Sequence, residues 1–213
     1  MRYLYILTII LATSIYADSY NKIELSETKK ELSYEIFKKL DKEHYLRKID
    51  KDNLNSQYFE AIFDRLDKNK NYFIANEVHK YLIKSKENEV KNFDIELAYD
   101  LINLYFERLI EYSEFQINLI QTVDFDFTKD EYLDIFYEDN QWLTNFTDLK
   151  DLWRLETKND LLIAKISDSS SSDPKVDLVK RYQNRIRRIN QQKEEDIFSL
   201  AINILTNQFD PHS

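Results

Sequence analysis

The polar segment 67–71, with the sequence DKNKN, has the residue types of a metal-binding loop. Its Asp and Asn side chains would supply oxygen ligands at positions 1, 3 and 5 of a calcium loop. The pattern then fails, because Tyr72 occupies position 6, where glycine makes the sharp turn, and Val78 occupies position 12, where a bidentate glutamate closes the site. Glu77 lies one residue too early to replace it. We therefore predict a polar turn between two helices and no calcium site.

Other residue types that carry chemistry are scattered. The three histidines His44, His79 and His212 lack metal-ligand spacing, and no catalytic triad is readable. The absence of cysteine excludes disulfides, thiolate metal sites and thiol catalysis. The absence of glycine, for which codon bias is an alternative cause, argues against phosphate-binding loops, dinucleotide fingerprints and nucleophile elbows. We predict no catalytic, cofactor-binding or metal-binding residue in this chain.

Positive charge is concentrated in one segment around Tyr182. The cluster consists of Lys175, Lys180, Arg181, Arg185, Arg187 and Arg188. Residues 181, 185 and 188 share one helix face, and the whole chain has a formal net charge of −9. We therefore favour ion pairs with carboxylates over a nucleic-acid surface, and expect neither nucleic acid nor an anionic membrane as the main partner. Trp142 and Trp153 are interpreted as core or interface anchors.

The first 17 residues have the pattern of a secretory leader. Met1 and Arg2 form a short positive region, and residues 3–16 are apolar or small without a charge. Ile15 and Ala17 then suit the −3 and −1 positions of a cleavage site, so we expect cleavage after Ala17. The alternatives are a buried helix or a membrane anchor, but fourteen residues fall short of the roughly 20 that span a bilayer. We expect a periplasmic protein without a stable membrane anchor.

Apolar periodicity is helical along almost the whole remaining chain. Helices are expected over residues 26–47, 55–66, 76–85, 94–122, 148–166, 174–192 and 194–209. The helix over 94–122 would be on the order of 40 Å long and would form the centre of the array. The fold class is therefore all-α, a multi-helix array with one long central helix and no sheet.

Three signals locate helix ends and a link. Ser26 is expected to cap the first helix, and Asp173 followed by Pro174 is a strong helix start. Thr128 with Glu131 has the spacing of a capping box, which predicts a further helix after residue 126. Residues 167–173, SDSSSSD, are interpreted as a flexible link. Residues 18–213 are otherwise treated as one helical domain.

A series of short motifs resembles the N-terminal helical region of the tail-specific proteases, also called carboxyl-terminal processing proteases. The earlier motifs are His44-Tyr45, Phe59, Phe63, Leu66-Asp67, Tyr72-Phe73 and Val78. The later ones are Phe125-Asp126-Phe127-Thr128, Trp142, Leu152-Trp153-Arg154, Lys158-Asn159-Asp160, Arg181-Tyr182, Arg188, Asp196 to Ala201, and Phe209-Asp210-Pro211-His212. Each motif is weak alone, but their order over about 170 residues behind a leader makes the resemblance specific.

The resemblance implies a periplasmic serine endopeptidase that recognises apolar C-terminal tails through a PDZ domain and cleaves with a serine/lysine dyad. In that family these domains follow the Asp-Pro-His motif, whereas this sequence stops at Ser213. We therefore expect a truncated or split gene product that is inactive alone. It would form a platform for the missing PDZ and protease domains, an adaptor lipoprotein or substrates with apolar C-termini. The alternative is a free-standing periplasmic helical interaction module with no link to proteolysis.

Overall fold

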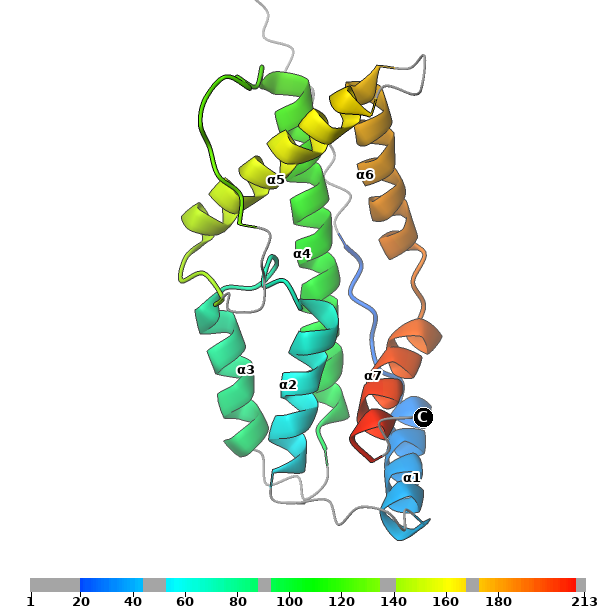
Figure 1. Ribbon diagram of the computed structural model, residues 1–213. Coiled ribbons are helices and arrows are strands. Elements are labelled where there is room, and N and C mark those ends of the chain that lie inside the picture. Colours follow the sequence, from blue (N-terminus) through cyan, green and yellow to red (C-terminus); the bar gives the residue numbers. More distant parts are fainter. Residues whose placement is uncertain (1–19, 44–52, 88–92, 135–140, 168–172, 210–213) are drawn as a thin grey trace, which may run out of the picture.

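The computed structural model describes residues 20–43, 53–87, 93–134, 141–167 and 173–209. These residues form seven α-helices and no strand, so the predicted all-α fold is confirmed (Figure 1). The helices are α1 (Glu27–Glu43), α2 (Leu54–Leu66), α3 (Ala75–Glu87), α4 (Ile95–Thr122), α5 (Phe146–Ile166), α6 (Pro174–Asn190) and α7 (Glu194–Phe209). Wherever the structure describes a predicted helix end, the observed end lies within two residues of it.

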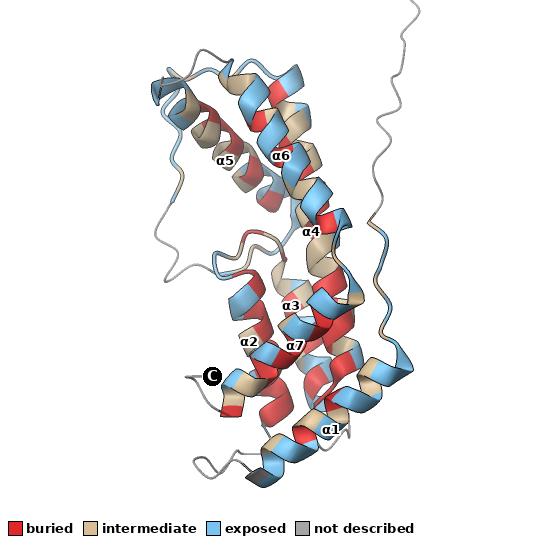
Figure 2. Ribbon diagram, turned by 90° about the vertical axis from the view of Figure 1, so that its right-hand side faces the viewer, coloured by how far each residue is buried: buried red, intermediate tan, exposed pale blue. Residues whose placement is uncertain are grey.

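Helix α4 is the long central helix that the sequence predicts. Its 28 residues correspond to about 42 Å. Helices α1, α2, α3 and α7 pack around its first half, whereas α5 and α6 lie against its second half (Figure 1). The molecule is therefore elongated along α4, and the end of α7 lies beside α1, far from the junction of α5 and α6 (Figures 1 and 2).

The main core lies around the first half of α4. Phe93, directly before α4, is fully buried, and its ring contacts those of Tyr34, Phe37 and Tyr58 at centroid distances of 5.5 to 5.9 Å. Two smaller clusters fill the second half, one around Trp153 of α5 and one around Tyr182 of α6. Complete burial of a large apolar side chain contributes about 1.5–3 kcal/mol, so all three clusters help to hold helices on α4.

Two of the predicted helix caps are confirmed. The Ser26 hydroxyl accepts a hydrogen bond from the backbone N–H of Lys29 at 3.3 Å. The Asp173 carboxylate accepts one from Lys175 N–H at 2.9 Å, with Pro174 at the first position of α6. Such bonds satisfy donors that have no partner within the helix.

The helix predicted after residue 126 is wrong. Residues 123–134 are not helical, and they run alongside α5 (Figure 1). Asp126 accepts hydrogen bonds from both the backbone N–H and the hydroxyl of Thr128, at 2.9 and 2.6 Å. The Thr128 hydroxyl is therefore used as a donor, and Glu131 pairs with Arg154 and Lys158 of α5. Thr128 and Glu131 thus make these contacts in place of the reciprocal bonds of a capping box.

Several predicted features lie outside the described residues. They are the leader with its cleavage site after Ala17, His44, His212 and link residues 168–172. The flanking residues are described: Ser167 ends α5, and Asp173 begins α6. Within the described part of the chain, no helix has the length and apolar character to cross a membrane.

Candidate functional site

Asp67 holds the turn between α2 and α3 through both of its carboxylate oxygens. Oδ1 accepts a hydrogen bond from Asn71 N–H at 2.6 Å, and Oδ2 accepts one from Phe73 N–H at 3.1 Å. The N–H of Tyr72 lies 3.2 and 3.3 Å from the two oxygens, and Trp142 Nε1 donates to Oδ2 at 3.0 Å. The predicted polar turn is confirmed, because the oxygens of this buried carboxylate are engaged by backbone and indole donors.

The turn is formed without glycine. Lys70 adopts a left-handed conformation with φ 58°, which glycine reaches at less cost. The Lys70 ammonium lies 5.1 Å from the centre of the Trp142 ring. Burial raises the pKa of Asp67, and the hydrogen bonds to Phe73, Trp142, Asn71 and Tyr72 oppose that rise. The carboxylate therefore orders the turn and attaches it to residue 142.

A second carboxylate, that of half-buried Glu156 in α5, continues this network. Asn71 Nδ2 donates to Oε1 at 2.6 Å, and the Tyr112 hydroxyl donates to Oε2 at 2.7 Å. Trp153 Nε1 donates to the backbone oxygen of Asn71 at 2.7 Å. Burial raises the pKa of Glu156 to about 7, although the hydrogen bond from Tyr112 and the nearby charge of Arg185 oppose that rise. The turn, α4 and α5 thus meet at a group that titrates near neutral pH.

The basic cluster of α6 divides into inward and outward side chains. Arg181 forms an ion pair with Asp160 of α5. Arg185 instead donates to Gln116 Oε1 at 3.2 Å and lies over the rings of two tyrosines. The prediction of ion pairs at positions 181, 185 and 188 therefore holds for Arg181 alone among the described residues. The remaining members, apart from half-buried Lys175, are exposed: Lys180, Arg187 and Arg188.

The other sequence candidates are not brought together. His79 lies exposed on α3, and no group of acidic, histidine or cysteine side chains that could hold a metal occurs in the described ranges. Trp153 is fully buried, as its interpretation as an anchor predicts. Trp142 is half-buried against Phe63 and Asp67, so its indole also has a packing role.

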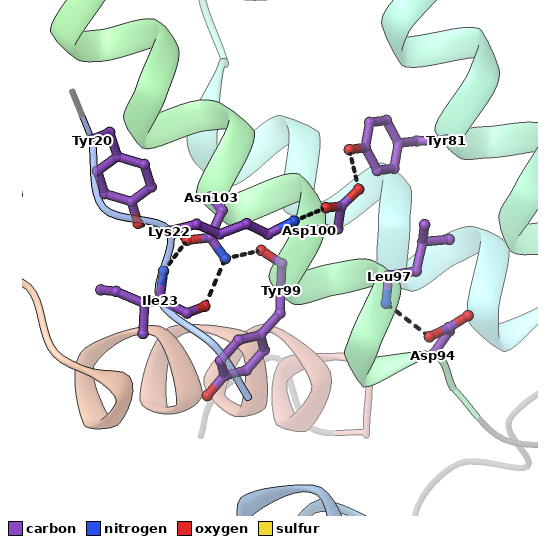
Figure 3. Close-up of polar contacts among 9 residues, drawn as sticks. All are labelled: Tyr20, Lys22, Ile23, Tyr81, Asp94, Leu97, Tyr99, Asp100 and Asn103. Carbon is purple, nitrogen blue, oxygen red and sulfur yellow. Dashed lines mark hydrogen bonds and ion pairs between the residues drawn. The ribbon is translucent and has the colours of Figure 1, made fainter. Parts of the chain in front are cut away.

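The segment before α1 crosses α4 and is held there by one buried amide, that of Asn103 (Figure 3). Its Oδ1 accepts from Ile23 N–H and from the Tyr20 hydroxyl, both at 2.8 Å, while Nδ2 donates to Ile23 O at 3.0 Å. Lys22 forms an ion pair with Asp100 one turn away. Sequence reasoning did not select Asn103, although an amide within an apolar stretch of α4 is a recognisable signal.

Replacing Asn103 by leucine should release this segment and lower the free energy of unfolding by about 2 kcal/mol. Leucine has a similar size but leaves the buried backbone groups of Ile23 without partners. Urea denaturation and amide hydrogen exchange at Ile23 measure the two effects. Asn118→Leu, on the exposed face of the same helix, is the matched control and should change neither quantity. Equal behaviour of the two variants would contradict the role assigned to Asn103.

The end of the molecule formed by α5 and α6 exposes apolar side chains. Ile163 and Ile166 are 53% and 73% exposed, and Leu162 and Val176 lie near them in the chain with 39% and 46% exposure. We call these four residues the apolar end. Beside it, a cavity of about 510 Å³ lies between α5 and the segment 127–133. Sequence reasoning missed the apolar end, although the run 161–164 is apolar on more than one helix face.

Comparison with known proteins shows the family of this chain. A family model described as "Tail specific protease N-terminal domain" matches residues 36–213. The chain belongs to the tail-specific protease family. A tail-specific protease of Haemophilus influenzae is 30% identical over 183 residues, which cover 82% of this chain and 26% of that relative. The chain thus spans about a quarter of the length of this curated relative.

The match places α2 to α7 and the second half of α1 within the tail-specific protease N-terminal domain. Segment 20–26, held by Asn103, precedes the matched residues. The Asp67 turn, the Glu156 network and the apolar end all lie within them. Several residues that carry the sequence resemblance are therefore those that hold the helices of this tail-specific protease domain together, among them Asp67, Trp142 and Trp153.

Proposed function

We propose that this chain is the non-catalytic helical domain of a periplasmic tail-specific serine endopeptidase and provides a platform for subunit, adaptor or substrate contacts. The leader pattern of residues 1–17 supports export, with Asp18 as the first residue of the mature protein. Family membership supports the link to proteolysis. The predicted absence of catalytic residues supports a contact role.

The apolar end is the observation that carries the platform proposal. Four large aliphatic side chains that are more than one third exposed occur in the last turns of α5 and the first turn of α6. Exposed apolar side chains gathered in one region are typical of interaction sites in soluble proteins. The ends of α5 and α6 that carry these side chains lie at the opposite end of the long axis from the end of α7, so contacts here leave the region around the end of α7 free (Figure 1).

A chimera tests the proposal. This chain, with its own leader, replaces the matching N-terminal region of the Haemophilus influenzae protease. We expect export, Asp18 at the mature N-terminus, and degradation of a substrate with an apolar C-terminal tail. Ile163→Asp combined with Ile166→Asp should lower kcat/KM about tenfold, corresponding to about 1.4 kcal/mol of transition-state stabilisation. The chain alone should not digest casein.

Leu32→Asp combined with Ile83→Asp is the matched control, because each of these side chains is 39% exposed on a different helix. It should leave kcat/KM within about twofold of the parent. Equal losses in both double variants would contradict a platform at the apolar end. A folded and exported chimera without tail-directed proteolysis would favour a free-standing interaction module, and casein digestion by the chain alone would overturn the non-catalytic assignment.

A further inference from the structure

Helix α6 has a charge opposite to that of the protein. It carries six basic residues and one acidic residue, whereas the whole chain has a formal net charge of −9. Arg181 and Arg185 are engaged with α5 and α4. The side chains of Lys175, Lys180 and Arg187 form no ion pair with another described residue. Their charge is therefore available to a partner.

A shallow groove of about 440 Å³ lies beside these charges, between the last turn of α4 and the start of α6. Ile120, Val176 and Val179 provide its apolar lining, and Lys175 and Lys180 lie beside them. Val176, Lys180, Gln183 and Arg187 succeed each other at intervals of three and four residues, which places them on one stripe of α6 about 16 Å long. The outer side of α6 is largely exposed along this length (Figure 2).

We propose that this groove binds an acidic amphipathic helix of a protein partner. The proposal rests on the proposed function, because it assigns the chemistry of one partner to the platform. Apolar side chains at helical spacing would fill the space over Val176 and Val179, while flanking carboxylates meet Lys180 and Arg187. The concave apolar lining favours a helix over a lipid surface, and the net charge of −9 opposes phosphate-rich surfaces.

Fluorescence anisotropy with a labelled peptide tests this assignment on the full mature chain. The probe is an amphipathic helical peptide of about 15 residues with leucine at helical spacing and glutamate on both flanks. We expect saturable binding that weakens as salt rises from about 50 to about 500 mM. A matched peptide with lysine in place of glutamate should bind at least about tenfold more weakly. Equal binding of the two peptides would overturn the proposal.

Protein variants then locate the site. Lys180→Glu combined with Arg187→Glu should weaken binding of the acidic peptide about tenfold. Val176→Ser changes no charge and should weaken binding through loss of the apolar contact. Lys38→Glu combined with Lys42→Glu, exposed on α1, is the matched charge control and should stay within about twofold. Thermal unfolding of each variant shows whether α6 remains folded. Unchanged affinity in the folded α6 variants would overturn the site.

Two competitors separate the other classes of partner. Phosphatidylglycerol vesicles and a single-stranded DNA oligonucleotide should each fail to displace the peptide at equal charge concentration. Displacement by either would overturn the assignment to a protein segment. These measurements need no proteolysis, so the two proposals can fail separately. An inactive chimera with intact peptide binding would contradict only the link to proteolysis. An active chimera without peptide binding would contradict only the assignment of this groove.

Discussion

Replacing Asp67 by asparagine should lower the free energy of unfolding by about 3 kcal/mol. The asparagine amide has one acceptor oxygen and would direct an NH₂ group at donors that now bond to the carboxylate. These donors are the backbone N–H groups of Asn71, Tyr72 and Phe73 in the turn itself and the indole of Trp142, which is distant in sequence. Leaving buried donors without acceptors costs about 1–3 kcal/mol for each group, and more where charge is involved. Urea denaturation measures the loss.

Asp64→Asn is the matched control for this prediction. It makes the same chemical change on the exposed face of α2, one turn before Asp67, and should alter stability by less than about 0.5 kcal/mol. Added calcium should leave the melting temperature of the parent unchanged, because the Asp67 oxygens are engaged by N–H donors. A small effect of Asp67→Asn, or stabilisation by millimolar calcium, would contradict the structural role of this carboxylate.

The helices could be predicted from sequence because their information is local. Apolar spacing in α2 and α4 and the Asp173-Pro174 start of α6 act within a few residues, and the structure reproduces them. The failure at Thr128 has the opposite cause. Its capping partner Glu131 is captured by Arg154 and Lys158, which follow it by more than 20 residues in sequence, so a local pattern was overridden by a tertiary contact.

The residues that carried the family resemblance acquire a physical meaning in the fold. Asp67 accepts a hydrogen bond from Trp142, 75 residues later in the chain, and Trp153 donates to the backbone of Asn71. In the same way, Asp160 pairs with Arg181 and Tyr182. Motifs that are separate in sequence are thus partners in space. The sequence shows the order of the motifs. Which motifs contact one another becomes visible only from the arrangement of α4, α5 and α6 in the structure.

The sequence does not distinguish Glu156 from the other members of its 39 acidic residues. What sets Glu156 apart is that segments far apart in sequence shield it from solvent. Asn71 and Tyr112 bring two donors to it from the turn and from α4. The same holds for Asn103, whose role depends on a segment 80 residues earlier. Sequence reasoning therefore predicted where helices lie, but not which polar groups they would enclose.

Replacing Glu156 by glutamine should remove a pH dependence of stability. The pKa of Glu156 is about 7 in the folded protein and near 4.5 in the unfolded chain, so the folded state binds this proton more tightly. Stability from this group is therefore fully present below about pH 4.5 and is lost as the pH rises through 7. The loss amounts to about 3 kcal/mol, at about 1.4 kcal/mol for each unit of pKa difference. Urea denaturation between about pH 5 and pH 8 measures it.

Glutamine keeps an acceptor for the Tyr112 hydroxyl. Its NH₂ group can donate to Asn71 if the side-chain amide of Asn71 rotates by about 180° and exchanges its oxygen and nitrogen. Such a rotation would use Asn71 Oδ1, which is buried without a hydrogen-bond partner. We therefore expect Glu156→Gln to be more stable than the parent at pH 8 and to lose that advantage at pH 5. Glu60→Gln, on the exposed surface of α2, should retain the pH dependence of the parent. The same pH dependence in Glu156→Gln and the parent would show that Glu156 is not the titrating group at the junction of the turn, α4 and α5.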